Sequence, residues 1–171
     1  MAVMFSPARK GKYKQMQNKY KLPKDVYQSV IWIIRGQERR EQVYKANKDE
    51  ILNGGGANYI KRYNSLLKSN EYIYLPKGHS NQSSTEIKAL ALAVLDSTEE
   101  TKRMKAVINS LNEAASRFDN ADEIKQAIIK NVNDRHLYPY RNLGNLYISE
   151  KTFYKTKALF IFLVAEKLNY I

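Results

Sequence analysis

The 171-residue chain contains no cysteine, which excludes disulfides, thiolate catalysis and metal sites made from cysteine. Histidine is scarce too: His79 and His136 are the only two, and neither has metal-ligand spacing or a recognisable nucleophile as a partner. Apolar runs are all shorter than a bilayer-spanning helix, and the apolar Met1–Phe5 precedes basic residues, the reverse of a secretory signal. We therefore expect a soluble, intracellular protein that is not an enzyme and that uses no cofactor, no metal and no membrane.

Acidic residues are scarce at both ends of the chain. The net charge is +12; residues 1–25 carry seven basic side chains and one acidic, and residues 130–171 carry seven and three. Residues 26–129 contribute only +2. Basic ends joined by a nearly neutral middle favour contact with a polyanion, although a basic run can also be plain solvated surface.

Alternating strand patterns are almost absent, Tyr72–Leu75 being the exception, so the sequence predicts an all-α fold: a helical bundle with long helices and a C-terminal helix-turn-helix. Residues 1–22 are predicted to form a mobile basic arm. One helix should start near Pro23, bury an apolar face as far as Ile34, and continue to residue 53 as a charged segment in solvent or along a partner.

Three glycines, Gly54–Gly56, should end this helix as a flexible joint, since no Gly-Lys-Ser/Thr follows to make a phosphate loop. Residues 57–69 are then predicted as a short helix and residues 70–82 as a polar loop. Ser83–Glu86 has the pattern of a capping box and opens a heptad seam from Ile87 to Phe118. A second such pattern at Ser97–Glu100 leaves open whether this segment is one helix or two.

The seam suits packing inside one chain, and it also suits a homodimer interface. Beyond it, a helix is predicted from Ala121 to Asn131, capped by Asp119 or Asn120, with Ile124, Ala127, Ile128 and Val132 facing inward. The carboxylates at positions 99, 100, 122 and 123 fall at helix starts, where the helix dipole explains them without an active site.

The last part of the chain should form the helix-turn-helix: a turn closed by Pro139, a short helix Arg141–Tyr147, and a long helix capped by Ser149. The long helix has one apolar stripe that should pack inward: Phe153, Thr156, Phe160, Leu163 and Val164. Its other side should face a DNA duplex. The predicted DNA-binding residues are Arg141, Ser149, Glu150, Lys151, Tyr154, Lys155 and Lys157.

Cations on that side can meet phosphates or base edges, and a phenol can bond a phosphate or pack on a thymine methyl. His136, in the preceding turn, is expected to cap a helix end or meet a phosphate. The chain is thus predicted to divide into a flexible arm (1–22), a helical scaffold (23–118) and a DNA-binding region (119–171).

Two pairs of segments carry a family resemblance. Leu22–Tyr27 with Val30–Arg35, and Ile148–Tyr154 with Phe160–Leu168, resemble the small phage-encoded late-gene transcription activators of Gram-positive hosts, the ArpU- and RinA-like regulators. Their C-terminal part is similar to the promoter-reading region of sigma factors. The resemblance implies a sequence-specific activator that binds double-stranded DNA upstream of late lytic or packaging genes. It also implies host RNA polymerase as a partner and the nucleoid of the bacterial cytoplasm as the location.

Two other functions fit parts of the sequence. A DNA-packaging protein of small-terminase type also joins a helix-turn-helix to oligomerising helices, and the seam from Ile87 to Phe118 favours it. A non-specific architectural DNA-binding protein would rely on the basic arm instead.

Overall fold

The computed structural model describes residues 20–53, 59–64, 69–74 and 84–171. These residues are predominantly helical, which confirms the predicted all-α class, and one two-stranded hairpin is the exception among them. The described residues form two compact units: unit 1 contains residues 20–35 together with Ala106–Ile171, and unit 2 contains the described residues between Gly36 and Lys105. This division by packing differs from the predicted boundaries after residues 22 and 118, because helices from both halves of the chain share the core of unit 1.

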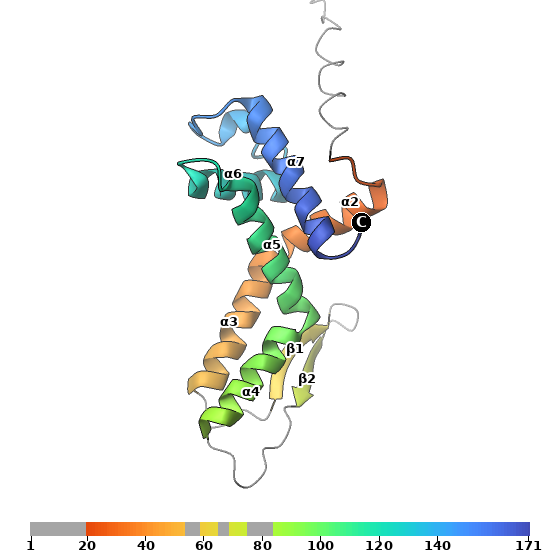
Figure 1. Cartoon of the computed structure of the whole chain (residues 1–171), viewed down its shortest axis with the longest axis vertical. Coiled ribbons are helices and arrows are strands. Elements are labelled where there is room, and N and C mark those ends of the chain that lie inside the picture. Colours follow the sequence, from red (N-terminus) through yellow and green to blue (C-terminus); the bar gives the residue numbers. More distant parts are fainter. Residues whose placement is uncertain (1–19, 54–58, 65–68, 75–83) are drawn as a thin grey trace, which may run out of the picture. The chain divides into compact units, whose positions relative to one another are not determined.

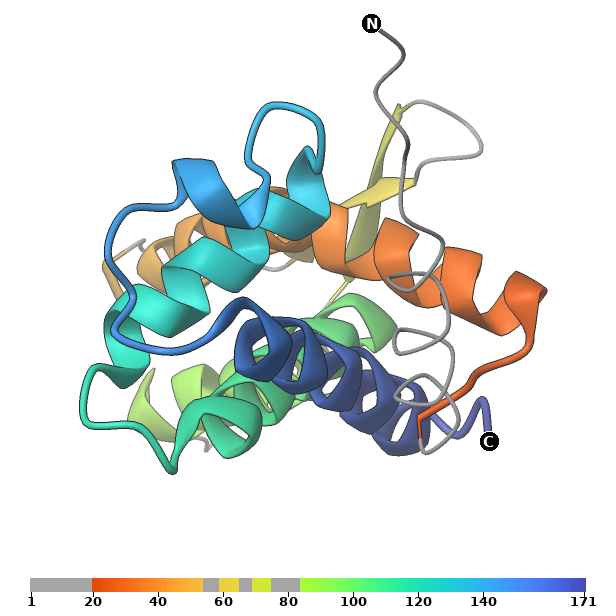
Figure 2. The same cartoon turned by 90° about the horizontal axis from the view of Figure 1, so that it is seen from above.

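Unit 1 is built around three helices that touch one another: α2 (Lys24–Arg35), α6 (Ala121–Asn133) and α7 (Glu150–Lys167). Figure 2 shows them around a common interior. The second half of α5 (Glu99–Ala115) contributes Val107, Ala114 and Ala115 to the same core. The largest side chains that are fully buried there are Val30, Ile34, Ile124, Ile128, Phe153 and Phe160. The predicted inward faces of the three helices are thereby confirmed.

The ends of these helices follow their sequence signals. Asp25 in the first turn of α2 and Arg35 in its last turn complement the helix dipole. The Nε of Arg35 donates to the carbonyl of Val132 at 3.1 Å, which ties the end of α2 to the end of α6. Ser149 has extended backbone angles and its hydroxyl accepts from the amide of Thr152 at 3.1 Å, so the predicted N-cap of α7 is confirmed.

The predicted short helix Arg141–Tyr147 is wrong. Only a single 3-10 turn, η1 (Tyr140–Asn142), lies there, and the chain then runs to α7 without regular structure. Gly144 and Tyr147 both have positive φ, +81° and +51°, which no α-helix tolerates. Two side-chain hydrogen bonds hold this irregular segment: the Asn120 amide donates to the carbonyl of Leu146, and the Tyr140 hydroxyl donates to the carbonyl of Ile148. The expected three-part helix-turn-helix is therefore not formed between α6 and α7.

Unit 2 pairs α3 (Gln37–Asn53) with α4 (Ser84–Ser97), next to an antiparallel hairpin of β1 (Tyr59–Asn64) and β2 (Ser69–Tyr74) (Figure 1). The hairpin corrects two predictions, a helix at 57–69 and a loop that starts at residue 70. Tyrosine and isoleucine favour strands, and each strand has a partner rich in the same residues to pair with. The predicted arm up to residue 19, the glycine joint Gly54–Gly56, His79 and Ser83 lie outside the described residues.

The charged part of the first predicted helix does not run free in solvent, because α3 packs on α4. Gly36 separates α3 from α2, where one continuous helix was predicted. Arg40 is only 5% exposed, and its Nε lies 2.6 Å from a carboxylate oxygen of Glu100. A second polar link joins the Tyr44 hydroxyl to the Asp96 carboxylate at 3.0 Å. Arg40 thus contributes to packing within unit 2, whereas most other charged residues of α3 are exposed.

The segment with the heptad seam is two helices, α4 and α5, separated by Thr98. The Thr98 hydroxyl accepts from the amide of Thr101 at 3.3 Å and so caps the start of α5. Three predicted seam residues, Ile87, Leu90 and Ile108, are 36–39% exposed, whereas Ala91 and Leu95 are buried. A continuous seam is therefore not formed within the described residues.

Candidate nucleic-acid interface

The N-terminal half of α7 presents two cations to the outside. Lys151 and Lys155 are exposed and lie four residues apart, so their side chains stand one above the other on one side of the helix. Neither takes part in the ion pairs found among the described residues. Ser149 and Glu150 are exposed at the start of the same helix. This side of α7 is therefore open to a partner.

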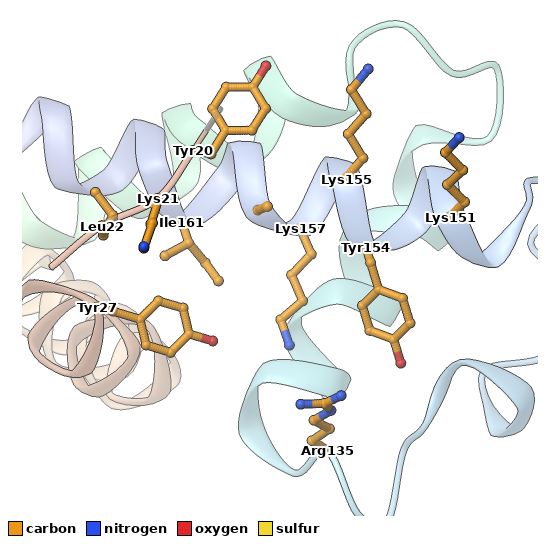
Figure 3. A pocket seen from close by; sticks show the side chains of 11 residues that line it. Tyr20, Lys21, Leu22, Tyr27, Arg135, Lys151, Tyr154, Lys155, Lys157 and Ile161 are labelled. Atoms are coloured by element: carbon orange, nitrogen blue, oxygen red, sulfur yellow. The ribbon is translucent and has the colours of Figure 1, made fainter. Parts of the chain in front are cut away.

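A pocket of about 420 Å³ adjoins these lysines within unit 1 (Figure 3). Its walls come from the segment before α2, from α2 itself, from the turn after α6 and from α7. Five lining residues are basic: Lys21, Arg135, Lys151, Lys155 and Lys157. Three are tyrosines: Tyr20, Tyr27 and Tyr154. The lining contains no aspartate or glutamate among the described residues, so the pocket has a positive potential.

Figure 3 separates the cations of this pocket into two groups. Lys157 and Arg135 point toward each other, and the phenols of Tyr27 and Tyr154 point into the space around them. Lys151 and Lys155 point the other way. The surface thus has an outer pair of lysines on α7 and an inner pair made of one lysine and one arginine.

Lys157 is buried, which corrects the prediction that it faces DNA with Lys151 and Lys155. It is only 9% exposed, and its Nζ donates to Oδ1 of Asn131 at 2.6 Å. The physical reason is helical phase: Phe153 and Ile161, four residues before and after Lys157, are both buried. Those two apolar neighbours in its row were the sequence signal for burial.

Among the described residues, Lys157 forms no ion pair with a carboxylate. Burial lowers the pKa of Lys157 most, and the positive charges of Arg135 and Arg35 lower it further, from 10.5 to about 8. Lys157 is therefore still mainly a cation at neutral pH, although the charges of two arginines act on it. Its ammonium group donates to an amide oxygen rather than to a carboxylate. Asn131 is held in this role because its Nδ2 donates to the carbonyl of Tyr138 at 2.7 Å.

A tight turn places Arg135 at the mouth of the pocket. The carboxylate of Asp134 accepts the backbone N–H groups of His136 at 2.9 Å and Leu137 at 3.0 Å, as aspartate does in Asx turns. The hydrogen bond from Leu137 is the main reason that the pKa of Asp134 is lowered, ahead of that from His136. His136 is exposed here, and its predicted role as a helix cap or as a phosphate contact stays a prediction.

The structure brings together only part of the predicted site. Lys151, Tyr154, Lys155 and Lys157 line one pocket, whereas Arg141 is exposed on η1 and lies outside that lining. Tyr154 is half-buried, and its ring packs edge-on against Phe153 with 5.4 Å between centroids. Sequence reasoning missed the other half of the pocket, which includes Tyr20, Lys21, Tyr27 and Arg135. These residues come from separate segments, and no local pattern links them.

No protein-family model, curated protein or solved structure matches this chain. The described residues contain no cluster of three or more histidine, aspartate or glutamate side chains that could hold a metal. The part of the chain that the structure describes also has no helix with the length and apolar character to cross a membrane.

Proposed function

We propose that this protein binds double-stranded DNA through the exposed side of α7 and activates transcription of phage late genes together with host RNA polymerase. The observation that carries the DNA-binding part is the pair Lys151 and Lys155, exposed on one side of a capped helix, beside a pocket that contains only basic, phenolic and apolar side chains. The resemblance of both ends of the chain to late-gene activators supports the transcriptional part.

The packing of α7 supports its use as a reading element. Phe153, Phe160 and Val164 are fully buried and anchor one side of the helix in the core. The Ser149 cap fixes where the helix begins, so Lys151 and Lys155 project from a rigid support. A major groove admits an α-helix, and lysines on its exposed side reach either base edges or phosphates.

Because the predicted helix Arg141–Tyr147 is absent, the proposed mode of binding differs from that of a helix-turn-helix. Here α7 contacts the duplex without a preceding short helix across the backbone. The exposed Arg141 on η1 takes that place as a phosphate contact, and Ser149 and Glu150 lie at the leading end of α7.

The packaging alternative has less support. The seam that favours it is interrupted at Thr98, so it is not one continuous oligomerising helix.

The test is selection of duplexes from a random library by the full-length protein, followed by fluorescence anisotropy with the selected sequence. We expect an enriched motif and a loss of roughly 100-fold or more in affinity for Lys151→Gln/Lys155→Gln, since each of the two charge-assisted contacts contributes about 1.5–3 kcal/mol. The matched control is Lys45→Gln/Lys48→Gln, which removes the same charge from exposed positions on α3.

Equal affinity of the α7 variant and the wild type would refute the DNA-binding surface. Equal losses in both double variants would show that net charge, rather than α7, determines binding. A reporter driven by late-gene promoters, with and without the protein, tests the activation step, and an unchanged output would refute that step alone.

A further inference from the structure

The inner half of the pocket contains a cation that lacks a counter-charge. Lys157 is nine-tenths buried, its Nζ is bonded to the amide oxygen of Asn131, and the charges that act on it come from Arg135 and Arg35. A buried cation without an anionic partner is costly, and a second cation beside it raises the cost. An anion bound between Lys157 and Arg135 would offset this cost.

The space beside these two cations has the size and lining of a small-molecule site. Pockets for such ligands have volumes of roughly 300–1,000 Å³, and this one has about 420 Å³. The phenols of Tyr27 and Tyr154 point into it, and Leu22, Ala158 and Ile161 add apolar wall (Figure 3). Phenols can donate to an anion through their hydroxyls, and their rings can stack on a planar base.

We propose that this pocket binds a mononucleotide, with its phosphate between Arg135 and Lys157 and its base against the tyrosine rings and the apolar wall. A guanidinium offers two parallel N–H groups to phosphate oxygens and an ammonium adds a point charge, so together they match a phosphate dianion better than a single carboxylate. The proposal does not depend on DNA binding, because Lys151 and Lys155 point away from this inner pair.

The test is isothermal titration calorimetry of the full-length protein at pH 7 with four ribonucleoside 5′-monophosphates, their four nucleosides and inorganic phosphate. At this pH both inner cations are charged. We expect at least one monophosphate to bind, its nucleoside to bind undetectably, and inorganic phosphate to bind more weakly than the nucleotide.

The variants are Arg135→Gln and the control Lys45→Gln, which removes one positive charge from an exposed position on α3. We expect Arg135→Gln to weaken nucleotide binding by roughly 10- to 100-fold, the effect of a charge-assisted contact, and Lys45→Gln to leave it unchanged. Circular dichroism verifies that both variants are folded.

Three results would each overturn the proposal: no binding of any of the four nucleotides at millimolar concentration, equal binding of a monophosphate and its nucleoside, or equal weakening by Arg135→Gln and Lys45→Gln. None of these results bears on duplex binding, which is measured with the variants of Lys151 and Lys155.

Discussion

At the scale of single residues, Lys157 shows how a basic side chain can be buried without an acidic partner. Its alkyl stem packs in a row with Phe153 and Ile161, and only an amide oxygen receives its charged end. The folded state therefore holds a proton less tightly than the unfolded chain does, and the stability of the fold depends on pH.

This linkage predicts a pH slope. The pKa of Lys157 is about 8 in the folded protein and 10.5 without burial, so between these values the unfolded chain binds more protons and the free energy of unfolding rises with pH. The expected rise between about pH 7.5 and 9.5 is on the order of 2 kcal/mol from this group, measured by urea denaturation. Lys157→Met should flatten the slope, and the exposed Lys130→Met should keep it. An identical slope in all three proteins would contradict the burial of a charged lysine.

The N-cap of α7 gives a second prediction at this scale. Ser149→Ala removes the acceptor for the amide of Thr152 and should lower the free energy of unfolding by about 1 kcal/mol. The matched control is Ser29→Ala, at an exposed position inside α2, which should change it by no more than about 0.5 kcal/mol. Chemical denaturation of both variants measures the difference, and equal effects would show that the cap contributes nothing.

At the scale of elements, Gly36 lies at the break between α2 and α3 and closely approaches the side chain of Arg40. A Cβ at Gly36 would lie 3.0 Å from Nη1 of Arg40 and 3.2 Å from its Cζ. Arg40 cannot easily withdraw, because it is buried and paired with Glu100. Gly36 can be read from the sequence, but the steric conflict with a side chain at this position is visible only once the guanidinium of Arg40 is packed beside it.

A double-mutant cycle tests this arrangement. Gly36→Ala should destabilise the wild type, whereas in an Arg40→Ala background it should be neutral or stabilising, because alanine is favoured over glycine by about 0.5–1 kcal/mol when space allows. The expected coupling is about 1 kcal/mol, measured by urea denaturation of the four proteins. Additive effects would refute the steric explanation.

Elements with strong local signals could be predicted from the sequence, and those fixed by partners could not. The Ser149 cap and the buried row Ile124, Ala127, Ile128 and Val132 follow from side-chain chemistry and helical period, and both were predicted correctly. The hairpin was missed because Tyr59, Ile60 and Tyr63 fit a helical spacing as well as a strand, and pairing with β2 decides between them. Half of the pocket was missed for the same reason: Tyr27 and Arg135 meet only after folding.

At the scale of the whole molecule, the net charge of +12 makes the ionic strength a test of the proposed DNA binding. Each phosphate neutralised should contribute about 0.9 to the slope of log affinity against log salt concentration, so four or five contacts would give a slope near −4. Lys155→Gln should reduce the slope by about one, whereas Lys45→Gln should leave it unchanged. Anisotropy at several salt concentrations measures both, and a slope near zero would exclude binding through phosphates.

The core of unit 1 determines how the protein can be divided for experiments. Phe153 and Phe160 of α7 share this core with Val30 and Ile34 of α2 and with Val107 of α5. A truncated chain of residues 119–171 would keep the proposed DNA-contacting side of α7 but lose the neighbours that cover its apolar face. Such a fragment should aggregate or lose helical ellipticity. It would therefore be a poor reagent for crystallisation or for screening of promoters.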